Sequence, residues 1–292
     1  MKCEIIPVQI RPAKQKLFCR FEDTPRVCED ICVNERERIS MIITITGQYG
    51  SGGDQVGVRL AQMLNYKLFD TELLIRAREI YAAEYGDVRP LKQERNGADN
   101  GNGTSGLNTA FKQAEFALQT DLMFADMINN EEFGPESEDF RKALLDAQTR
   151  AVLEYAEGGN CILFSKCASY ILRDYPDAIH AFSTANMDVR TMRVMNLHNI
   201  FADEGSEGKK RLSLTNVILA RKMSNTDRDA ARILIETTDK RRAAYHEFIT
   251  GEKWEHAKYY DFFISGNRLD YMEEQTELFL QFIREKEQST GR

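Results

Sequence analysis

The chain lacks a long apolar run, and none of its stretches approaches the about 18 to 20 apolar residues that a membrane-spanning helix needs. Its first residues, MKCEIIPVQIRPAKQK, contain charges and prolines that interrupt the apolar core of a secretion signal. We therefore expect a cytoplasmic protein that has no membrane partner.

The sequence also lacks a cysteine pattern suited to a metal ion. Four of the six cysteines lie in the first forty residues, and the close pair there is Cys28 and Cys32. That pair has no matching His or Cys pair at the spacing of a zinc finger, and Cys161 and Cys167 come much later. We predict reduced thiols and no metal site made by protein ligands alone.

An excess of positive charge is absent as well, because the net charge is −7 and the pI is near 5.4. A field of this sign repels polyanions, so nucleic acid is not an expected partner, and any phosphate ligand needs a local cluster of basic groups. What the chain does have is 42% hydrophobic residues in 292, enough for the core of one large domain.

The composition divides the chain into an extension and a domain. Residues 1–40 have mixed charge and no sustained periodicity, and they predict a loosely packed or disordered N-terminal extension. Met41 opens the first strong strand, so the functional domain is predicted over 41–288. Within it, the segment 96–106 reads NGADNGNGTSG, which favours a flexible loop because it can bury little apolar area.

Short apolar runs alternate with helical patterns along this domain. The β-branched run 42–46 predicts a buried parallel strand, and Val56, Leu60 and Leu64 then recur at helical spacing. Strands alternating with helices predict a parallel sheet covered on both faces, a three-layer α/β/α fold. Further strands are expected at 66–69, 161–164, 178–182 and 260–264, and helices at 71–85, 108–130, 137–157, 166–174, 187–201, 227–249 and 269–287.

The segment GQYGSGGD, residues 47–54, lies between the first strand and the first helix. It partly matches the phosphate-binding pattern G-x-x-x-x-G-K-[ST], in which backbone N–H groups converge on phosphate oxygens. Gly53 stands where the pattern has Lys, and Asp54 where it has Ser or Thr. A structural glycine turn is the alternative. The candidate nucleotide-binding residues are Gly47, Tyr49, Gly50, Ser51, Gly52, Gly53 and Asp54.

Four segments of this sequence resemble the cytidylate kinase-like family, in the same order. The first, ITITGQYGSGGDQVG, is similar to the family's I-T-I-S-R-x-Y-G-S-G-G, which typically lacks the Lys. The others are KLFDTELL, CILFSKCASYILRDYP and TTDKRRAAYHEFITGEKWEHAKYYDFFISG. The four segments are distributed over most of the range from residue 41 to residue 285.

This resemblance implies a P-loop NTPase-type fold with a helical acceptor-side insertion over 71–157 and a mobile lid over 200–245. It also implies ATP and Mg²⁺ as cofactors. The expected reaction is phosphoryl transfer from ATP to a nucleoside monophosphate, cytidylate-like, or to another small acceptor. The partners would be the nucleotide and that small molecule, and nothing in the sequence indicates an oligomeric state.

Basic residues near the end of the predicted lid are candidates for the charge that the loop lacks. On a helix, Lys240, Arg241 and Arg242 fan round about 200°, so that one or two can face the nucleotide while Asp239 orients Arg242. We predict catalytic roles for Arg241, Arg242 and Lys166, and a substrate-side role for Asp239. The alternative for the DKRR run is a solvated helix face. Other basic lid residues are Lys209, Lys210, Arg211, Arg221, Lys222, Arg228 and Arg232.

Two residues after the second strand are candidates for the acceptor side. Asp70 follows the strand, where α/β sheets place ligand-contacting groups, although it equally suits a helix N-cap. Arg76 lies six residues on and would reach an acceptor phosphate or stay on the surface. For Asp54, in the loop, three interpretations stay open. It would bind magnesium, repel the phosphates, or simply be favoured at the start of a helix by the helix dipole.

Departures from the family pattern lead to a second hypothesis. Gly47 stands where relatives have Arg, and SKCAS at 165–169 replaces G-R-C-A-D, so Lys166 replaces a bidentate guanidinium. Losing one preorganised charged donor lowers the rate by about 10² to 10³. The alternative function is therefore a catalytically weak or inactive nucleotide-binding or regulatory protein on the same fold.

Overall fold

The computed structural model describes residues 41–85, 118, 120, 124, 138–202, 216, 219, 220, 227–268 and 270–289. The predicted extension 1–40 and loop 96–106 lie outside these residues. So do most of the helix predicted at 108–130 and the lid cations from Lys209 to Lys222. Every structural statement below concerns the described residues.

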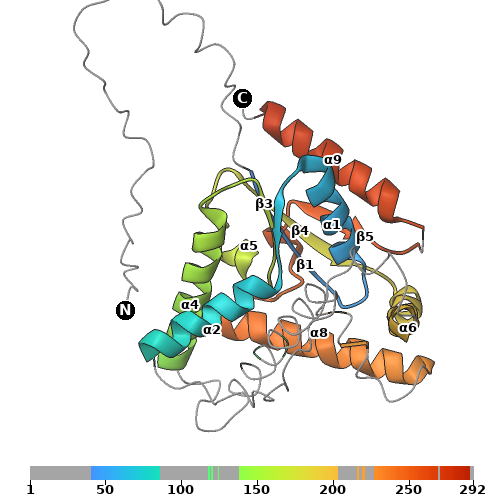
Figure 1. Cartoon of the computed structure of the whole chain (residues 1–292), viewed down its shortest axis with the longest axis horizontal. Coiled ribbons are helices and arrows are strands. Elements are labelled where there is room, and N and C mark those ends of the chain that lie inside the picture. The colour runs from blue at the N-terminus through green and yellow to red at the C-terminus, as the bar shows by residue number, and fades with distance from the viewer. Residues whose placement is uncertain are drawn as a thin grey trace, which may run out of the picture. The chain divides into compact units, whose positions relative to one another are not determined.

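Five strands form one sheet in the order β2-β3-β1-β4-β5, and every neighbouring pair is parallel (Figure 1). In the register, Ile43 lies between Ile162 on β3 and Ile179 on β4. The strand bounds are β1 Ile42–Gly47, β2 Lys67–Phe69, β3 Cys161–Phe164, β4 Ala178–Thr184 and β5 Phe262–Ser265. The all-parallel sheet confirms the predicted α/β class.

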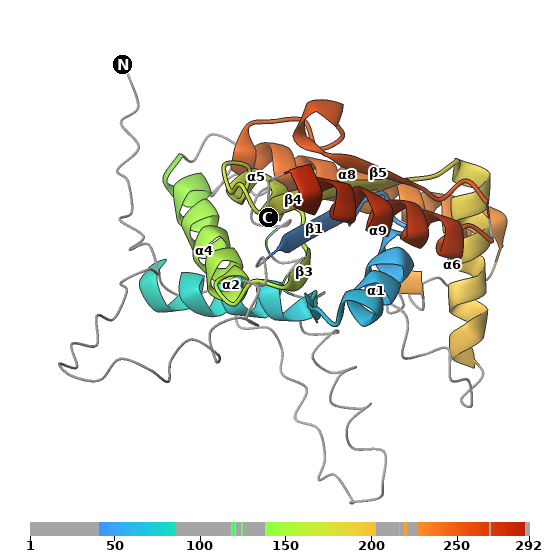
Figure 2. The ribbon, with the colours of Figure 1, turned by 90° about the horizontal axis from the view of Figure 1, so that it is seen from above.

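Helices cover both faces of this sheet, as the apolar strands require. Ile43 and Ile45 pack with α1 and α9, whereas Ile42 and Leu163 on the opposite face pack with residues of α2, α4 and α5 (Figure 2). The predicted three-layer arrangement is therefore correct. The helices are α1 Gly53–Leu64, α2 Thr71–Tyr85, α4 Glu138–Ala156, α5 Ala168–Ile171, α6 Met187–Ala202, α8 Arg228–Thr250, α9 Met272–Ser289 and the short 3-10 helix Ala257–Tyr259.

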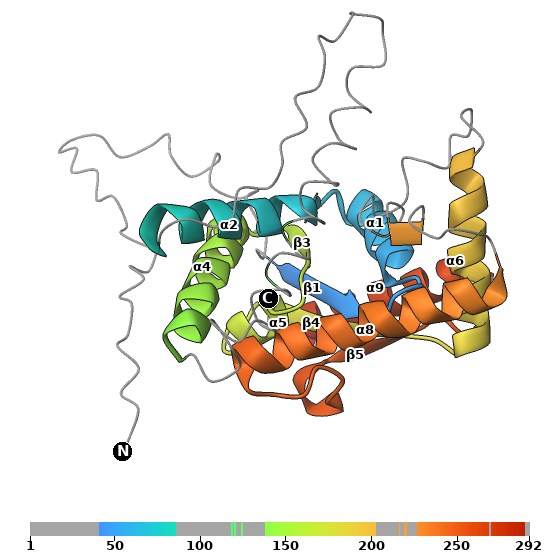
Figure 3. The same ribbon diagram turned by 90° about the horizontal axis from the view of Figure 1, so that it is seen from below.

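The 23-residue helix α8 positions much of the site. Its start is capped by Asp227, whose carboxylate accepts from the N–H of Ala230 at 2.6 Å, and it ends at Gly251 with φ 72°. The helix packs against α4 and against α6 (Figure 3). It therefore carries the DKRR run past the loop that follows β1.

Two predicted elements are shorter than expected. The helix predicted at 166–174 is reduced to Ala168–Ile171, because a turn begins at Leu172 and Pro176 follows. The last strand, predicted at 260–264, spans Phe262–Ser265, because Tyr260 is the C-cap of the 3-10 helix Ala257–Tyr259 and donates its N–H to the Ala257 carbonyl. Trp254 is 1% exposed and packs edge-on against Phe182, so it belongs to the core.

Among the helices of the described residues, none combines the length and the apolar character that crossing a membrane requires.

Candidate functional site

A cleft opens at the carboxyl end of β1, where parallel α/β sheets bind their ligands. The walls come from the loop after β1, the start of α2, the segment after β3, and α8. Its lining residues are Ile45, Thr46, Gly47, Gln48, Gly50, Ser51, Gly52, Gly53, Asp54, Asp70, Leu73, Leu74, Leu118, Gln148, Phe164, Ser165, Lys166, Ser183, Asn216, Leu219, Thr238, Arg242 and Tyr245.

The loop reaches the helix through two left-handed glycines. Gly50 has φ 76° and Gly52, the N-cap of α1, has φ 92°, a region that favours glycine. A Cβ on Gly52 would also lie 1.7 Å from the hydroxyl oxygen of Tyr271. These positions require glycine for the chain to turn directly into the first turn of α1.

Two buried arginines of α6 hold three successive carbonyl groups of the loop. Arg190 donates from Nε to the Tyr49 carbonyl oxygen at 2.8 Å. Arg193 donates from Nη1 to the carbonyl oxygens of Ser51 at 2.8 Å and Gly50 at 3.3 Å. The two side chains are 4% and 7% exposed. The loop carbonyls are thus drawn toward α6 and fixed there.

The remaining loop carbonyls are also occupied. The Gly47 oxygen accepts from Arg242 Nη1 at 2.8 Å, and the Gln48 oxygen accepts from the Ser51 N–H at 3.1 Å. The Gly52 oxygen accepts from the Tyr271 hydroxyl at 2.8 Å. Every carbonyl from 47 to 52 therefore has a donor within the protein.

In contrast to the carbonyl groups, several backbone N–H groups of the loop lack a hydrogen-bond partner among the described residues. Those of Gly50, Gly52, Gly53 and Asp54 have no acceptor among the described residues. All four residues line the cleft at the N-terminus of α1, where the helix dipole adds partial positive charge. A set of this kind is an anion-binding site.

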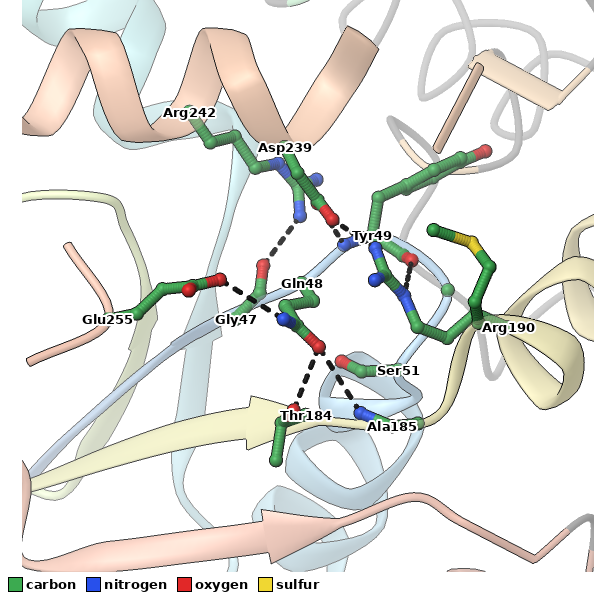
Figure 4. A network of polar contacts seen from close by, with 12 residues as sticks. Gly47, Gln48, Tyr49, Ser51, Thr184, Ala185, Arg190, Asp239, Arg242 and Glu255 are labelled. Atoms are coloured by element: carbon green, nitrogen blue, oxygen red, sulfur yellow. Dashed lines mark hydrogen bonds and ion pairs between the residues drawn. The ribbon is translucent and has the colours of Figure 1, made fainter. Parts of the chain in front are cut away.

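Asp239 ties the loop to α6 and α8 (Figure 4). Its carboxylate accepts from the Tyr49 N–H at 2.8 Å and forms an ion pair with Arg190 Nη2. Since Arg190 also binds the Tyr49 carbonyl, both polar groups of that residue's backbone are held by one ion pair. Gln48 is fixed in turn by Thr184 and Glu255.

The position where the phosphate-binding pattern has Lys has no room for a side chain. A Cβ on Gly53 would lie 2.5 Å from Cβ and 2.8 Å from Oγ of Ser183, a buried residue of β4. A Cβ on Gly47, where relatives have Arg, would lie 2.4 Å from the Ser183 carbonyl oxygen. Both missing cations are therefore excluded by the same neighbouring residue.

Restoring the Lys is expected to harm the protein. We predict that Gly53→Lys lowers the free energy of unfolding by about 1 to 3 kcal/mol, the usual result of overpacking, as measured by urea denaturation. Adding Ser183→Gly removes the opposing Cβ and Oγ and should recover part of the loss. A Gly53→Lys variant at least as stable as the parent would contradict the steric argument.

Lys166 and Arg242 are the cations among the described lining residues of the cleft. Arg242 also donates from Nη2 to the side-chain oxygen of Asn216 at 3.0 Å, and Asn216 donates to Asp54 at 3.1 Å. Lys166 lies with its ammonium 4.8 Å from the centre of the Tyr245 ring. Burial, followed by the charges of Arg242 and Arg241, holds the pKa of Lys166 well below its usual range.

Nucleotide binding is expected to take up a proton at Lys166. An anionic phosphate beside the amine favours the charged form, so its lowered pKa rises in the complex. The binding enthalpy should then depend on the ionisation enthalpy of the buffer, at pH values between the free and bound pKa. Lys166→Met should remove this dependence. Buffer-independent enthalpies in the parent protein would contradict the prediction.

The lowered pKa of Lys166 also predicts the direction in which the free energy of unfolding changes with pH. The unfolded chain keeps a proton that the native Lys166 has lost, so the free energy of unfolding rises with pH from the lowered pKa toward 10.5. The rise should be smaller in Lys166→Met.

The structure brings together most of the predicted site residues. The loop glycines with Ser51 and Asp54 lie in the cleft together with Asp70, Lys166 and Arg242, whereas Arg241 is absent from its described lining. Tyr49 is fully buried behind the loop, and its hydroxyl donates to the Asn216 carbonyl. Asp239 was expected to orient Arg242, and instead it pairs with Arg190.

Arg76 and the described lid cations Arg228 and Arg232 lie outside the lining of the cleft. Arg76 pairs with Glu154 at 2.8 Å and with Glu79 at 3.1 Å on the surface. Arg228 and Arg232 both pair with Asp188. The structure therefore places none of these three in the lining of the cleft.

Removing Arg76 is expected to have little effect. Because its side chain is 38% exposed and its ion pairs with Glu154 and Glu79 lie on the surface, Arg76→Ala should leave the urea midpoint of unfolding nearly unchanged. The affinity for any phosphoryl acceptor should stay the same. A large rise in KM would instead favour the acceptor role predicted from the sequence.

Several contributors were missed at the sequence level, namely Arg190, Arg193, Ser183 and Asn216. Arg190 and Arg193 are three residues apart on one helix directly after β4, so their spacing on one face was a usable signal. Ser183 and Asn216 carry no such local signal.

The family model described as the cytidylate kinase-like family matches residues 42–268. Comparison with curated proteins found no match.

Several solved structures are similar to the chain. An uncharacterized protein from Eubacterium ventriosum is 22% identical, with 84% of this chain and 99% of that chain covered and a TM-score of 0.48. A shikimate kinase from Bacteroides thetaiotaomicron is 12% identical (84% and 98% covered, TM-score 0.40). A shikimate kinase from Acinetobacter baumannii in complex with shikimate is also 12% identical, with 84% of this chain and 93% of that chain covered and a TM-score of 0.35.

The family match spans well over half of the sequence and includes the loop, β3 and the DKRR run. The chain therefore belongs to the cytidylate kinase-like family.

Proposed function

We propose that the protein is a phosphotransferase that moves a phosphoryl group from ATP to a small acceptor, with a nucleoside monophosphate as the first candidate. One observation carries the proposal. Four backbone N–H groups at the start of α1 have no acceptor among the described residues, while every carbonyl from 47 to 52 is held by a protein donor. Such an arrangement suits the phosphates of a nucleotide.

Two pairs of residues would replace the Lys that other phosphate loops have. Lys166 and Arg242 line the cleft and can neutralise charge that develops on phosphate oxygens. Arg190 and Arg193 lie behind the loop and fix its peptide dipoles with their carbonyls turned away from the ligand. Phosphoryl transfer depends mostly on positioning and charge stabilisation, which these residues supply.

A divalent cation fits this site only with help from its substrate. The described residues contain no group of three or more His, Cys, Asp or Glu side chains that could hold a metal. Asp54 and Asp70 line the cleft, and Mg²⁺ is commonly held by one or two carboxylates together with substrate phosphates. Bound in this way, Mg²⁺ would supply neutralisation of phosphate charge.

A second candidate is a protein that binds nucleotide without transferring phosphate. It is favoured by the contacts of Arg242, which already donates to Gly47 and Asn216, and by the lowered pKa of Lys166. The first engages donors of Arg242 that a phosphate would otherwise use, and the second reduces the positive charge on Lys166. This candidate shares the phosphate-binding loop and differs only in turnover.

Two measurements separate these candidates. Calorimetry with ATP and a nonhydrolysable analogue, with and without Mg²⁺, tests binding. A coupled assay for ADP formation across nucleoside monophosphates and small metabolites tests transfer. Acceptor-dependent ADP formation supports the phosphotransferase, binding without turnover supports the second candidate, and the absence of nucleotide binding would reject both.

A further inference from the structure

A second cavity lies at the amino-terminal edge of the sheet, opposite the edge that carries the phosphate loop. It has a volume of about 340 Å³ and is lined by polar groups from the end of α5, the starts of β4 and β5, and from α8 and α9. Ligand sites are typically about 300 to 1,000 Å³. The second cavity is therefore large enough for a small molecule.

His246 of α8 is one of the residues that line this cavity. The residue is 2% exposed, and its Nδ1 lies 2.7 Å from the carbonyl oxygen of Lys166. A carbonyl only accepts, so Nδ1 carries the proton, and burial lowers the pKa and keeps the ring neutral. Nε2 is then an acceptor, and no donor lies within hydrogen-bond distance of it among the described residues.

Arg173 provides unused donors at the same cavity. Its guanidinium stacks 4.4 Å from the centre of the Tyr170 ring. It pairs with Asp174 at 3.7 Å and with Glu252 at 3.8 Å, both too long for hydrogen bonds. Among the described residues it makes no hydrogen bond, so its planar fork can still take a carboxylate or phosphate.

The formal charge of the second cavity is positive in an acidic protein. Three cations line it, Arg173, Lys258 and Lys286, against the two carboxylates of Glu252 and Asp261. Asp261 is already engaged, since it accepts from the His180 N–H at 2.9 Å and pairs with Lys286 at 3.4 Å. With neutral histidines the lining residues sum to one positive charge, which suits a small anion, and Asp174, whose side chain is 93% exposed, adds its carboxylate from outside the lining.

We propose that the second cavity binds a small oxyanion that also carries a hydroxyl group. The oxyanion would take the fork of Arg173, and the hydroxyl would donate to Nε2 of His246. Orthophosphate, a phosphate monoester and a small hydroxy acid share this chemistry. The site lies apart from the cleft, so its binding of an anion does not require that the proposed phosphotransfer occurs.

Occupancy is expected to affect the cleft through one hydrogen bond. His246 holds the Lys166 carbonyl by its Nδ1, and Lys166 faces the cleft. A ligand on Nε2 polarises the ring and strengthens the bond at Nδ1, which restrains the backbone that carries the Lys166 ammonium. The ligand would therefore act as a regulator of the first site.

Calorimetry without nucleotide tests the binding, with orthophosphate, glycolate and acetate as probes. Orthophosphate or glycolate should bind with a dissociation constant of about 10 mM or tighter, and acetate, which lacks the hydroxyl, should bind at least about tenfold more weakly. Binding of glycolate alone would identify a hydroxy-acid site, and tighter binding of orthophosphate a phosphate site.

Two variants locate the binding. Arg173→Gln removes the fork, and His246→Asn keeps a donor for the Lys166 carbonyl while removing the Nε2 acceptor. Each should weaken the probes by about tenfold or more. Arg150→Gln is the matched control, because Arg150 is 45% exposed like Arg173 and pairs with Glu84 and Asp146. Thermal unfolding of each variant verifies folding.

Two results would overturn the proposal. One is the absence of saturable binding of both orthophosphate and glycolate. The other is orthophosphate binding that survives Arg173→Gln and His246→Asn and is lost in Arg242→Ala, which would place the anion at the phosphate loop. Neither result depends on whether the protein transfers phosphate.

Discussion

Replacing Asp239 with alanine is expected to lower the free energy of unfolding by about 3 to 5 kcal/mol. The substitution leaves Arg190 charged, 4% exposed and without the carboxylate that it now pairs with. It also removes the acceptor of the Tyr49 N–H. Urea denaturation followed by circular dichroism measures the loss, and a change below about 1 kcal/mol would contradict the prediction.

Paired substitutions separate the stability of this network from its role in binding. In Asp239→Ala with Arg190→Met no buried charge is left unpaired, so most of the stability should return. Nucleotide affinity should stay low, because nothing then fixes the Tyr49 carbonyl or its N–H. If affinity returned together with stability, the ion pair would be a support of the fold alone.

The second large effect is expected at Arg242. If the protein is a phosphotransferase, Arg242→Ala should lower kcat by about 10² to 10³, the usual loss for one preorganised charged donor. Arg242→Lys should recover only part of the rate, since Lys lacks the fork that joins Gly47 and Asn216. Single-turnover assays report this step without interference from product release.

Arg241 is the matched control for this prediction. It is the same residue type, adjacent on α8, and is absent from the described lining of the cleft. Arg241→Ala should therefore change stability more than rate. Equal losses of kcat in the two variants would mean that the DKRR run acts as a whole, as the sequence first indicated.

The order of the strands and helices and the position of the glycine loop could be predicted from the sequence. The β-branched run of β1, the glycines after it and the apolar repeat of α1 are local patterns, and each formed the expected structure. The exclusion of a side chain at Gly53 could not be predicted, because it depends on Ser183, 130 positions away on a neighbouring strand. The register between β1 and β4, and the distance between Ser183 and Gly53 that results from it, are set only when the chain folds.

Asp239 shows how a local expectation was overruled. Three residues from Arg242 on one helix, it was expected to form a pair worth about 0.2 to 0.5 kcal/mol. Arg190, on another helix, is buried, and leaving a buried charge unpaired costs several times more. The carboxylate therefore pairs with the distant residue, a choice that depends on burial and cannot be read from spacing.

The close approach of Ser183 to Gly47 and Gly53 also limits which sequences this protein can reach by single mutations. A lone Lys at position 53 or Arg at position 47 meets a clash with Ser183. At Gly53 the clash is with the Ser183 side chain, which a change to glycine at 183 removes, whereas at Gly47 it is with the Ser183 backbone, which no substitution removes. The order of substitutions therefore matters for a cation at position 53, whereas position 47 stays closed to any side chain as long as β1 and β4 keep their present register.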